Sequence, residues 1–254
     1  MIFRRIAQHV RDQNWTAIAI DFVIVVVGVF IGIQVSNWNA ARAEDARERM
    51  LLGELRAEVA ESIDQLAVKR AAYAQVGRSG ERAVAFLDAG AECGDRCWAI
   101  LVDFYHASQW QQVAVPRSTY DEMRRSGWPR NRAVVDAMEA YHRQADQFAR
   151  PLEEAPAYRS LVRGLVPLAA HRPYWERCFV LADGEERYLE DCPPGVAPAV
   201  SEAGVAAVVA HPDVHAALTE WTGFAGGVEV SLDGLIALGE RALATIESEL
   251  GDAP

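Results

Sequence analysis

Lysine is almost absent from this chain, and acidic residues outnumber basic ones. Lys69 is the single lysine among 25 basic residues, against 36 Asp and Glu, so the formal net charge is −11. A protein that binds nucleic acid needs a basic footprint for the phosphates, so we expect no nucleic-acid partner. Hydrophobic residues make up 51% of the 254 residues, which excludes an intrinsically disordered chain and suits one or two folded domains.

Proline is missing from nearly half of the chain. All 11 prolines lie at Pro116 or later, so no proline interrupts a helix before that point. Familiar catalytic patterns are missing too: there is no glycine-rich phosphate loop, no Gly-x-Ser-x-Gly elbow and no Cys-x-x-Cys pair. We therefore expect no cofactor, and the sequence favours a noncatalytic role over an enzymatic one.

The chain has instead one long apolar run that begins with an acid, DFVIVVVGVFIGIQVSNWN, residues 21–39. As a helix, the part from Ile18 to Val35 would extend roughly 27 Å, which matches a thin bilayer. Its thirteen Ile, Val and Phe residues favour insertion by roughly 4–8 kcal/mol, more than the roughly 2.5–3.5 kcal/mol that a central acid costs. Trp15 and Trp38 flank the run, where aromatic rings prefer the membrane interface. These features predict a transmembrane helix over residues 15–38 that anchors the chain in the lipid bilayer.

Two other interpretations of the run are weaker. A buried helix of a soluble protein rarely stays this apolar for so long. A cleaved signal peptide would use the small residues Ala41 and Ala43 as its cleavage site, but the run exceeds the usual 7–15 residues of a signal core.

The orientation of the span is not decided by its flanking arginines. The positive-inside rule counts basic residues near both ends, and the counts tie at three. The four cysteines favour an outside domain, because disulfides persist in oxidising compartments. We therefore predict a bacterial inner-membrane protein with segment 1–14 in the cytoplasm and the bulk domain outside. The arginines counted are Arg4, Arg5, Arg11, Arg42, Arg47 and Arg49.

Small and polar residues inside the span are candidates for packing. Gly28, Gly32 and Ser36 lie four residues apart, a spacing that lets two helices approach closely and predicts a homodimer or a membrane partner. Chance is the alternative, since glycine is common in such helices. Asp21 and Gln34 are the intramembrane polar residues, and Asp21 is near enough to the edge to be satisfied by headgroups or Arg11.

Beyond the membrane the sequence predicts a mainly α protein. Apolar residues at helical spacing indicate a stalk over 39–80, ended by Gly77–Gly80, and an extracytoplasmic helical domain over 81–254. Further helices are expected at about 81–88, 98–111 and 132–149, then one that follows Pro156 and ends near 170, and two more at about 201–224 and 231–250. The last two are separated at Gly226–Gly227, and Pro212 is a potential break in the first of them. A short helix after Pro116 has a potential capping box and ends at Gly127. The fold class is thus an antiparallel helical bundle with one small β-hairpin insertion near 174–196, where Asp183-Gly184 is a turn signal.

The cysteines favour local pairing, although four cysteines allow three connectivities. Cys178 and Cys192 flank the proposed hairpin, and a bridge there would contribute about 3 kcal/mol in the chain-entropy model. Cys93 and Cys97 can pair across a tight turn. Four unpaired thiols are the alternative, and a zinc site is disfavoured by the wide spacing of the second pair.

Histidines supply the few candidates for chemistry. His211 and His215 have the spacing of a metal pair, but Pro212 disfavours a helical His211. Glu139 and His142 have a Glu-x-x-His spacing that di-iron bundles use twice, whereas this chain has one copy. We therefore interpret both pairs as structural and expect no metal.

Three segments resemble a bacterial family of small membrane-anchored proteins catalogued only as a domain of unknown function. The segments are DFVIVVVGVFIGIQVSNWNAAR, STYDEMRRSGW with the following RAVVDAMEAYH, and the C-terminal HPDVHAALTEW…LATIESEL. They cover about a third of the chain, while 167–198 departs from the pattern like an insertion. The resemblance implies a single-pass anchor and a mainly helical domain, and it implies no chemistry.

Two functional hypotheses follow from the sequence. The first is a noncatalytic protein of the bacterial envelope that interacts with a partner, senses or scaffolds. The second is an extracytoplasmic enzyme or ligand-binding domain whose site is assembled only by the fold, with His106, His142 and the helix of Asp136 and Glu139 as candidates. A concave site that gathers those groups would favour the second hypothesis.

Overall fold

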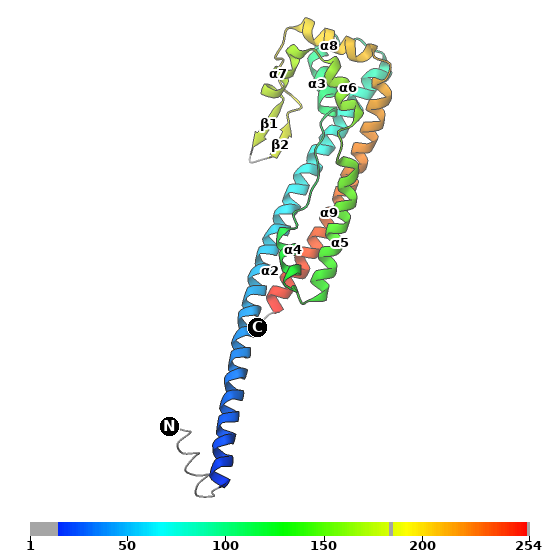
Figure 1. The fold of residues 1–254 in the computed structure, drawn as a ribbon. Helices are drawn as coiled ribbons and strands as arrows, with labels where there is room; N and C mark the ends of the chain where they lie inside the picture. The colour runs from blue at the N-terminus through cyan, green and yellow to red at the C-terminus, as the bar shows by residue number, and fades with distance from the viewer. Residues whose placement is uncertain (1–14, 183–184, 253–254) are drawn as a thin grey trace. The chain divides into compact units, whose positions relative to one another are not determined.

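A computed structural model describes residues 15–182 and 185–252 and confirms the predicted fold class (Figure 1). The chain is mainly helical, with a long apolar N-terminal helix and a single two-stranded antiparallel sheet among these residues. It divides into two compact units, Met1–Gly53 and Glu54–Pro254, which are described separately below. The predicted cytoplasmic segment 1–14 and the turn Asp183-Gly184 lie outside the described residues.

The first unit consists of the N-terminal part of helix α2, Trp15–Ala89. Its apolar side chains from Phe22 to Val35 are exposed, as expected for a helix that faces lipid. An 18-residue window has a mean hydropathy of 2.6 with none of it buried, so α2 is long and apolar enough to cross a membrane.

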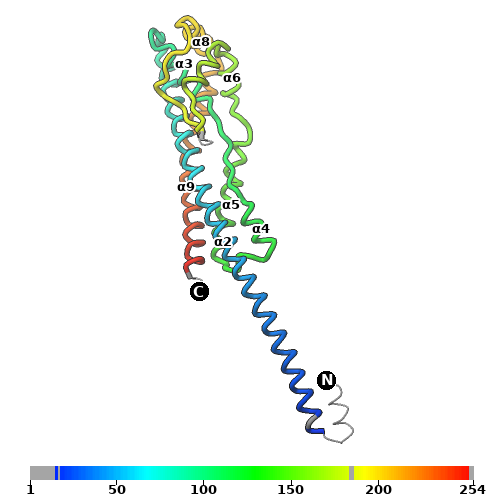
Figure 2. The backbone as a smooth tube through the Cα atoms, turned by 90° about the vertical axis from the view of Figure 1, so that its left-hand side faces the viewer, coloured from blue at the N-terminus to red at the C-terminus, as the bar shows by residue number. Residues whose placement is uncertain are grey.

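Three long helices form the body of the second unit: α2 from residue 54 onward, α5 (Arg132–Ala149) and α9 (Val214–Asp252). They lie side by side in both views (Figures 1 and 2). Arg56 pairs with Glu247 at 2.8 Å and Arg70 with Asp233 at 2.5 Å, so α2 and α9 run antiparallel.

The buried positions of α9 alternate between spacings of four and three residues, the pattern of coiled-coil packing. This packing corrects the predicted break at Gly226–Gly227. The helix is continuous there because Ala225 and Val228 are buried on either side, and their contacts outweigh the low helix propensity of glycine. The buried series is Val214, Leu218, Trp221, Ala225, Val228, Leu232, Leu235, Gly239, Ala242 and Ile246.

The predicted helix end at Gly77–Gly80 is also wrong, because α2 continues to Ala89. Gly80 is buried, and a Cβ atom built on it would overlap the side chain of Thr222 on α9. This glycine therefore serves close approach of two helices rather than a turn. A Cβ atom built on Gly77, three residues earlier in the same helix, would meet no neighbouring atom within 4 Å.

Shorter elements cover the end of the bundle at which α2 finishes (Figure 1). The predicted helix through Gln111 ends earlier, at Ala107. The predicted helix over 157–170 is divided because Val166, which precedes Pro167, is extended. The elements are η1 Gly94–Arg96, α3 Cys97–Ala107, η2 Arg150–Leu152, α6 Ala157–Leu165, α7 Leu168–Arg177 and α8 Pro198–Ala210.

The predicted hairpin is present as β1 (Phe179–Ala182) and β2 (Glu185–Tyr188), with Phe179 opposite Tyr188. Disulfides join Cys178 to Cys192 and Cys93 to Cys97, so the preferred local pairing is confirmed. The first of these bridges closes the base of the hairpin, because its cysteines lie just outside the two strands.

Candidate functional site

Helices α4 (Ser118–Arg125) and α5 border a polar surface cleft with a volume of about 340 Å³. Each side contributes four residues at spacings of i, i+3, i+4 and i+7, so each set lies on one helix face. We call this feature the α4–α5 cleft. Its lining residues are Arg117, Tyr120, Asp121 and Arg124 on one side and Glu139, His142, Arg143 and Asp146 on the other.

The start of α4 is fixed by a carboxylate from α2. Glu58 Oε2 accepts hydrogen bonds from Ser118 Oγ at 2.7 Å, Thr119 Oγ1 at 2.9 Å and the Thr119 amide at 3.3 Å. The predicted capping box is therefore wrong, since the two hydroxyls donate to Glu58 and the N-cap residue, Arg117, makes no side-chain cap. The predicted helix end is confirmed by Gly127, whose φ of +83° suits glycine.

Helix α5 is fixed at its own start by Asn131, whose side chain accepts a hydrogen bond from the Ala133 amide at 2.8 Å. Its buried face includes Val134, Met138 and Tyr141, each fully buried against the bundle. Tyr141 also bonds Ser62 of α2 at 2.8 Å. The cleft residues of α5 thus project from a rigid helix.

The charges of the cleft are unequally paired. Arg117 lies 2.9 Å from Asp146 and 3.9 Å from Asp121, so one guanidinium serves two carboxylates. Arg124 makes only a 3.5 Å contact to the carbonyl of Trp128, and Arg143 has no hydrogen bond or ion pair within the described part of the chain. Two exposed guanidiniums therefore line the cleft without carboxylate partners.

Two aromatic side chains on the inner side of the cleft are buried and incompletely bonded. Tyr120 and His142 are 3% and 2% exposed, with ring centres 5.3 Å apart. Burial and then the Glu139 carboxylate raise the pKa of Tyr120, and burial lowers the pKa of His142, so both are neutral near pH 7. Among the described residues, the hydroxyl of Tyr120 and Nδ1 of His142 make no hydrogen bond of normal geometry, although the Glu139 carboxylate lies near enough to Tyr120 to raise its pKa.

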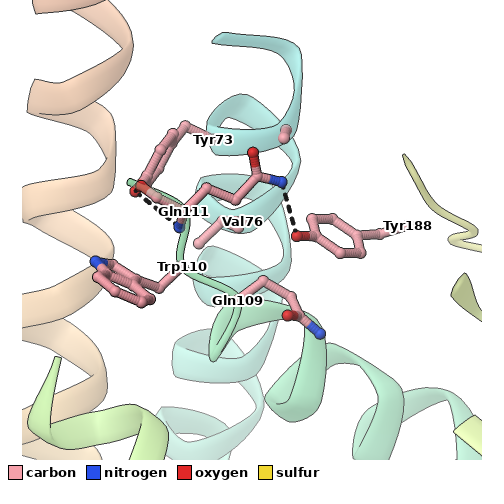
Figure 3. Close-up of a pocket in the computed structure, with 7 residues that line it drawn as sticks. Tyr73, Val76, Gln109, Trp110, Gln111 and Tyr188 are labelled. Atoms are coloured by element: carbon pink, nitrogen blue, oxygen red, sulfur yellow. Dashed lines mark hydrogen bonds between the residues drawn. The ribbon is translucent and has the colours of Figure 1, made fainter. Parts of the chain in front are cut away.

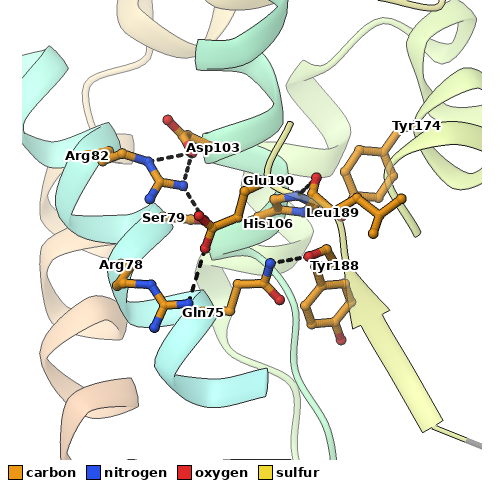
Figure 4. Close-up of polar contacts among 10 residues, drawn as sticks. All are labelled: Gln75, Arg78, Ser79, Arg82, Asp103, His106, Tyr174, Tyr188, Leu189 and Glu190. Carbon is orange, nitrogen blue, oxygen red and sulfur yellow. Dashed lines mark hydrogen bonds and ion pairs between the residues drawn. The ribbon is translucent and has the colours of Figure 1, made fainter. Parts of the chain in front are cut away.

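His106 lies elsewhere, in a buried polar network beneath the hairpin (Figure 4). It is 0% exposed, with Nε2 at 3.0 Å from the Leu189 carbonyl and Nδ1 at 2.6 Å from the Tyr174 hydroxyl. A carbonyl can only accept, so Nε2 carries the proton and Nδ1 accepts from Tyr174. Tyr174 in turn accepts from Gln109 at 2.8 Å. Each polar atom in this series of hydrogen bonds from His106 to Gln109 has a partner when the imidazole is neutral.

Burial is the main reason that the pKa of His106 is lowered from 6.5 to about 4. Polar groups of α2 surround the same junction: Gln75 donates to the Tyr188 carbonyl and Arg78 pairs with Glu190 at 3.1 Å (Figure 4). The network therefore holds the hairpin against the bundle, and the hydrogen bonds of His106 contribute to this attachment.

The pocket of Figure 3 adjoins this junction but has no room for a water molecule. Gln111 is one of its lining residues. Its side chain donates to the Tyr188 hydroxyl and to Glu186, each at 3.1 Å, while Tyr73 donates to the Gln111 carbonyl at 2.6 Å. Burial raises the pKa of Tyr73 to about 12. These residues hold the loop after α3 in place.

The structure gathers only part of the predicted set of candidates. Glu139 and His142 share the cleft, whereas His106 is in the hairpin network and Asp136 pairs with Arg132 at 2.9 Å on the surface. The residues that sequence reasoning missed are Tyr120, Arg124 and Arg143. Arg143 lies four residues after Glu139 on the same helix, which was a usable signal. Tyr120 and Arg124 lie on another helix, so no spacing in the sequence relates them to Glu139 and His142.

The two spaced histidines do not form a ligand pair. His211 follows the end of α8 and accepts a hydrogen bond from the Asp213 amide at 3.3 Å, while His215 on α9 contacts Asp88 at 2.7 Å. Within residues 15–182 and 185–252, no group of three or more His, Cys, Asp and Glu side chains is placed to hold a metal ion.

The membrane residues all lie on α2 in the first unit. Gly28 and Gly32 have open space where a Cβ would be, and the Arg42 guanidinium lies 4.5 Å above the Trp38 ring. The other predicted residues of the span are Trp15, Asp21, Gln34 and Ser36.

These features define a mainly helical protein with a candidate membrane span, a disulfide-closed hairpin and a polar cleft between two helices. Comparison of the chain with protein-family models, with curated proteins and with solved structures finds no match. The resemblance described from the sequence therefore stays a prediction.

Proposed function

We propose that this chain is a single-pass protein of the bacterial inner membrane whose helical domain lies outside the cytoplasm and acts by binding rather than by catalysis. The observation that carries the proposal is the apolar part of α2, which has a mean hydropathy of 2.6 and no buried side chains in its 18-residue window. Leaving such a surface in water is unfavourable by about 25 cal/mol for each Å² of apolar area, and a lipid environment removes that cost.

The disulfides support the outside location of the domain. Both cysteine pairs are bonded, and disulfides are rare in the cytoplasm because cellular thiols reduce them. A single span then leaves the N-terminus on the cytoplasmic side.

The hydrogen-bond network at the hairpin disfavours a catalytic role for His106. A general base must reach a substrate proton, but both ring nitrogens of this histidine are engaged and its side chain is fully buried. The role of His106 is therefore structural.

Reporter fusions test the location. Alkaline phosphatase fused after Pro254 should be active and green fluorescent protein at the same place should be dark, because the first folds only outside the cytoplasm and the second fluoresces inside. A fluorescent, phosphatase-inactive pair of fusions would overturn the orientation. Recovery of the protein in the soluble fraction after washing at high salt would overturn the anchor.

The proposed partner in the membrane is a second copy, bound through Gly28 and Gly32. Replacing both by isoleucine should reduce self-association of the span at least several-fold, since bulky side chains prevent close approach. The matched control replaces Val26 and Phe30 by isoleucine, at the same spacing on the opposite face of the helix. Equal self-association of both double variants would remove these glycines from the proposal.

An unidentified membrane or envelope protein is the other proposed partner. Isolation of the tagged chain in mild detergent, followed by mass spectrometry, identifies the proteins that are bound to it. Recovery of the chain alone would count against a stable complex with another protein.

A further inference from the structure

The α4–α5 cleft has room for a small ligand. Its volume of about 340 Å³ falls within the range of small-molecule sites, which begins near 300 Å³. The pocket beside Tyr188 admits no water, and the apolar pocket beside Trp98 has about 10 Å³. Of these three pockets, the α4–α5 cleft is therefore the candidate for ligand binding.

The open charges of the cleft favour an anion. Arg117 pairs with both Asp121 and Asp146, whereas Arg124 and Arg143 have no carboxylate partner among the described residues. The lining holds three arginines and three carboxylates, so the cleft has no net charge and attracts an anion only locally, at these two guanidiniums. A guanidinium binds a carboxylate through two parallel hydrogen bonds, the strongest match for its planar fork. The Glu139 carboxylate in the same cleft disfavours a second negative charge on the ligand.

The inner side of the cleft has hydrogen-bonding capacity that the protein itself leaves unused. Nε2 of His142 lies 3.2 Å from the Pro116 carbonyl, so Nε2 carries the proton and Nδ1 is an acceptor. That acceptor and the Tyr120 hydroxyl are both buried without a hydrogen bond of normal geometry, although the Glu139 carboxylate lies near enough to Tyr120 to raise its pKa. An unpaired buried polar atom is costly, and a ligand that supplies a donor and an acceptor would satisfy both.

We propose that the α4–α5 cleft binds a small monocarboxylate that carries a neighbouring hydroxyl group. Arg124 and Arg143 hold the carboxylate at the outer side of the cleft. The ligand hydroxyl donates to Nδ1 of His142 and accepts from the Tyr120 hydroxyl on the inner side. Binding is reversible and involves no covalent step.

Isothermal titration of the full chain in detergent micelles tests the proposal with glycolate, lactate and acetate as probes. Glycolate and lactate should bind at least five-fold more tightly than acetate, because acetate has the carboxylate but lacks the hydroxyl. Failure of glycolate and lactate to bind at millimolar concentration would overturn the proposal. Equal affinity for glycolate and acetate would overturn the role of the inner side.

Arginine variants locate the bound anion. Arg124→Gln with Arg143→Gln should weaken glycolate binding at least ten-fold. The control, Arg125→Gln with Arg150→Gln, removes the same charge from exposed positions outside the cleft lining and should change binding less than two-fold. All four side chains are exposed, so circular dichroism and melting should match the wild type. Equal loss in both double variants would overturn the site, leaving only a general effect of charge.

Tyr120→Phe tests the inner side separately. The variant keeps the ring and removes only a hydroxyl that makes no hydrogen bond of normal geometry to the described residues, so the fold should persist. Affinity for glycolate should fall several-fold while affinity for acetate stays constant. These titrations are independent of membrane orientation, so their failure would leave the proposed location of the domain untouched.

Discussion

Replacement of His106 by glutamine should flatten the acid dependence of stability in the second unit. The wild-type imidazole is neutral in the folded protein, with a pKa lowered to about 4, whereas an unfolded chain protonates it near 6.5. Between these values the unfolded state binds the extra proton, so stability is complete above about pH 6.5 and is lost as the pH falls toward 4.

The magnitude follows from that pKa difference. At 1.36 kcal/mol for each pH unit, the wild type should lose about 3 kcal/mol through this one group. That is a large part of the roughly 5–15 kcal/mol that stabilises a typical domain. His142 adds to the loss in the same direction, because burial also lowers its pKa.

Urea denaturation of the full chain in micelles measures the effect. Tryptophan fluorescence is a suitable readout: the chain has seven tryptophans, and one of them, Trp221, is 4% exposed and donates to the Ala107 carbonyl at 2.7 Å. The variant will be less stable than the wild type near pH 7, because the Tyr174 hydroxyl and the Leu189 carbonyl lose their imidazole partner. The informative quantity is the difference in slope: between about pH 7 and 4.5 the wild type should lose about 2–3 kcal/mol more than the variant. Parallel pH profiles of the two proteins would refute the reasoning.

Two further predictions concern packing and cross-linking. Gly80→Ala should destabilise the fold by about 1–3 kcal/mol, because the added methyl group overlaps Thr222. Gly77→Ala, which has open space on the same helix, should stabilise it by up to about 1 kcal/mol through helix propensity. Thermal unfolding compares the two variants, and equal effects would contradict the close approach of α2 and α9. Replacing Cys178 and Cys192 by serine should cost about 3 kcal/mol of unfolding free energy. Because reductant also opens Cys93–Cys97, the reduced wild type should match the variant treated with the same reductant. An unchanged melting temperature in the variant would show that the hairpin is held without the bridge.

Several features could be predicted from sequence because local chemistry decides them. The apolar run needs no tertiary partner to be recognised as a candidate span, since its length and hydropathy are read directly from the residues. Helix α5 begins at Arg132, after a capping Asn131, as its pattern indicates. Cys178 and Cys192 were predicted as a pair because strands on either side of a turn bring their ends together.

Other features depended on neighbours that are remote in sequence. Glycine pairs near Gly80 and Gly226 suggest helix ends, but α2 and α9 pass through them because each helix packs along the other. Ser118 and Thr119 suggest a self-capped helix, yet Glu58, about 60 residues earlier, accepts their hydrogen bonds. Propensity is worth tenths of a kcal/mol for most residues, so contacts of this kind override it.

The sequence by itself determined a candidate membrane span, a helical domain and a disulfide-closed hairpin, because hydrophobicity, periodicity and cysteine spacing act over short distances. Tertiary structure alone decided which polar residues meet. It buried His106 beneath the hairpin in a neutral state, and it brought the faces of α4 and α5 together around Arg124, Arg143, Tyr120 and His142. The physical reason is that a binding site depends on distances between side chains on different helices, and those distances are set by how the bundle packs.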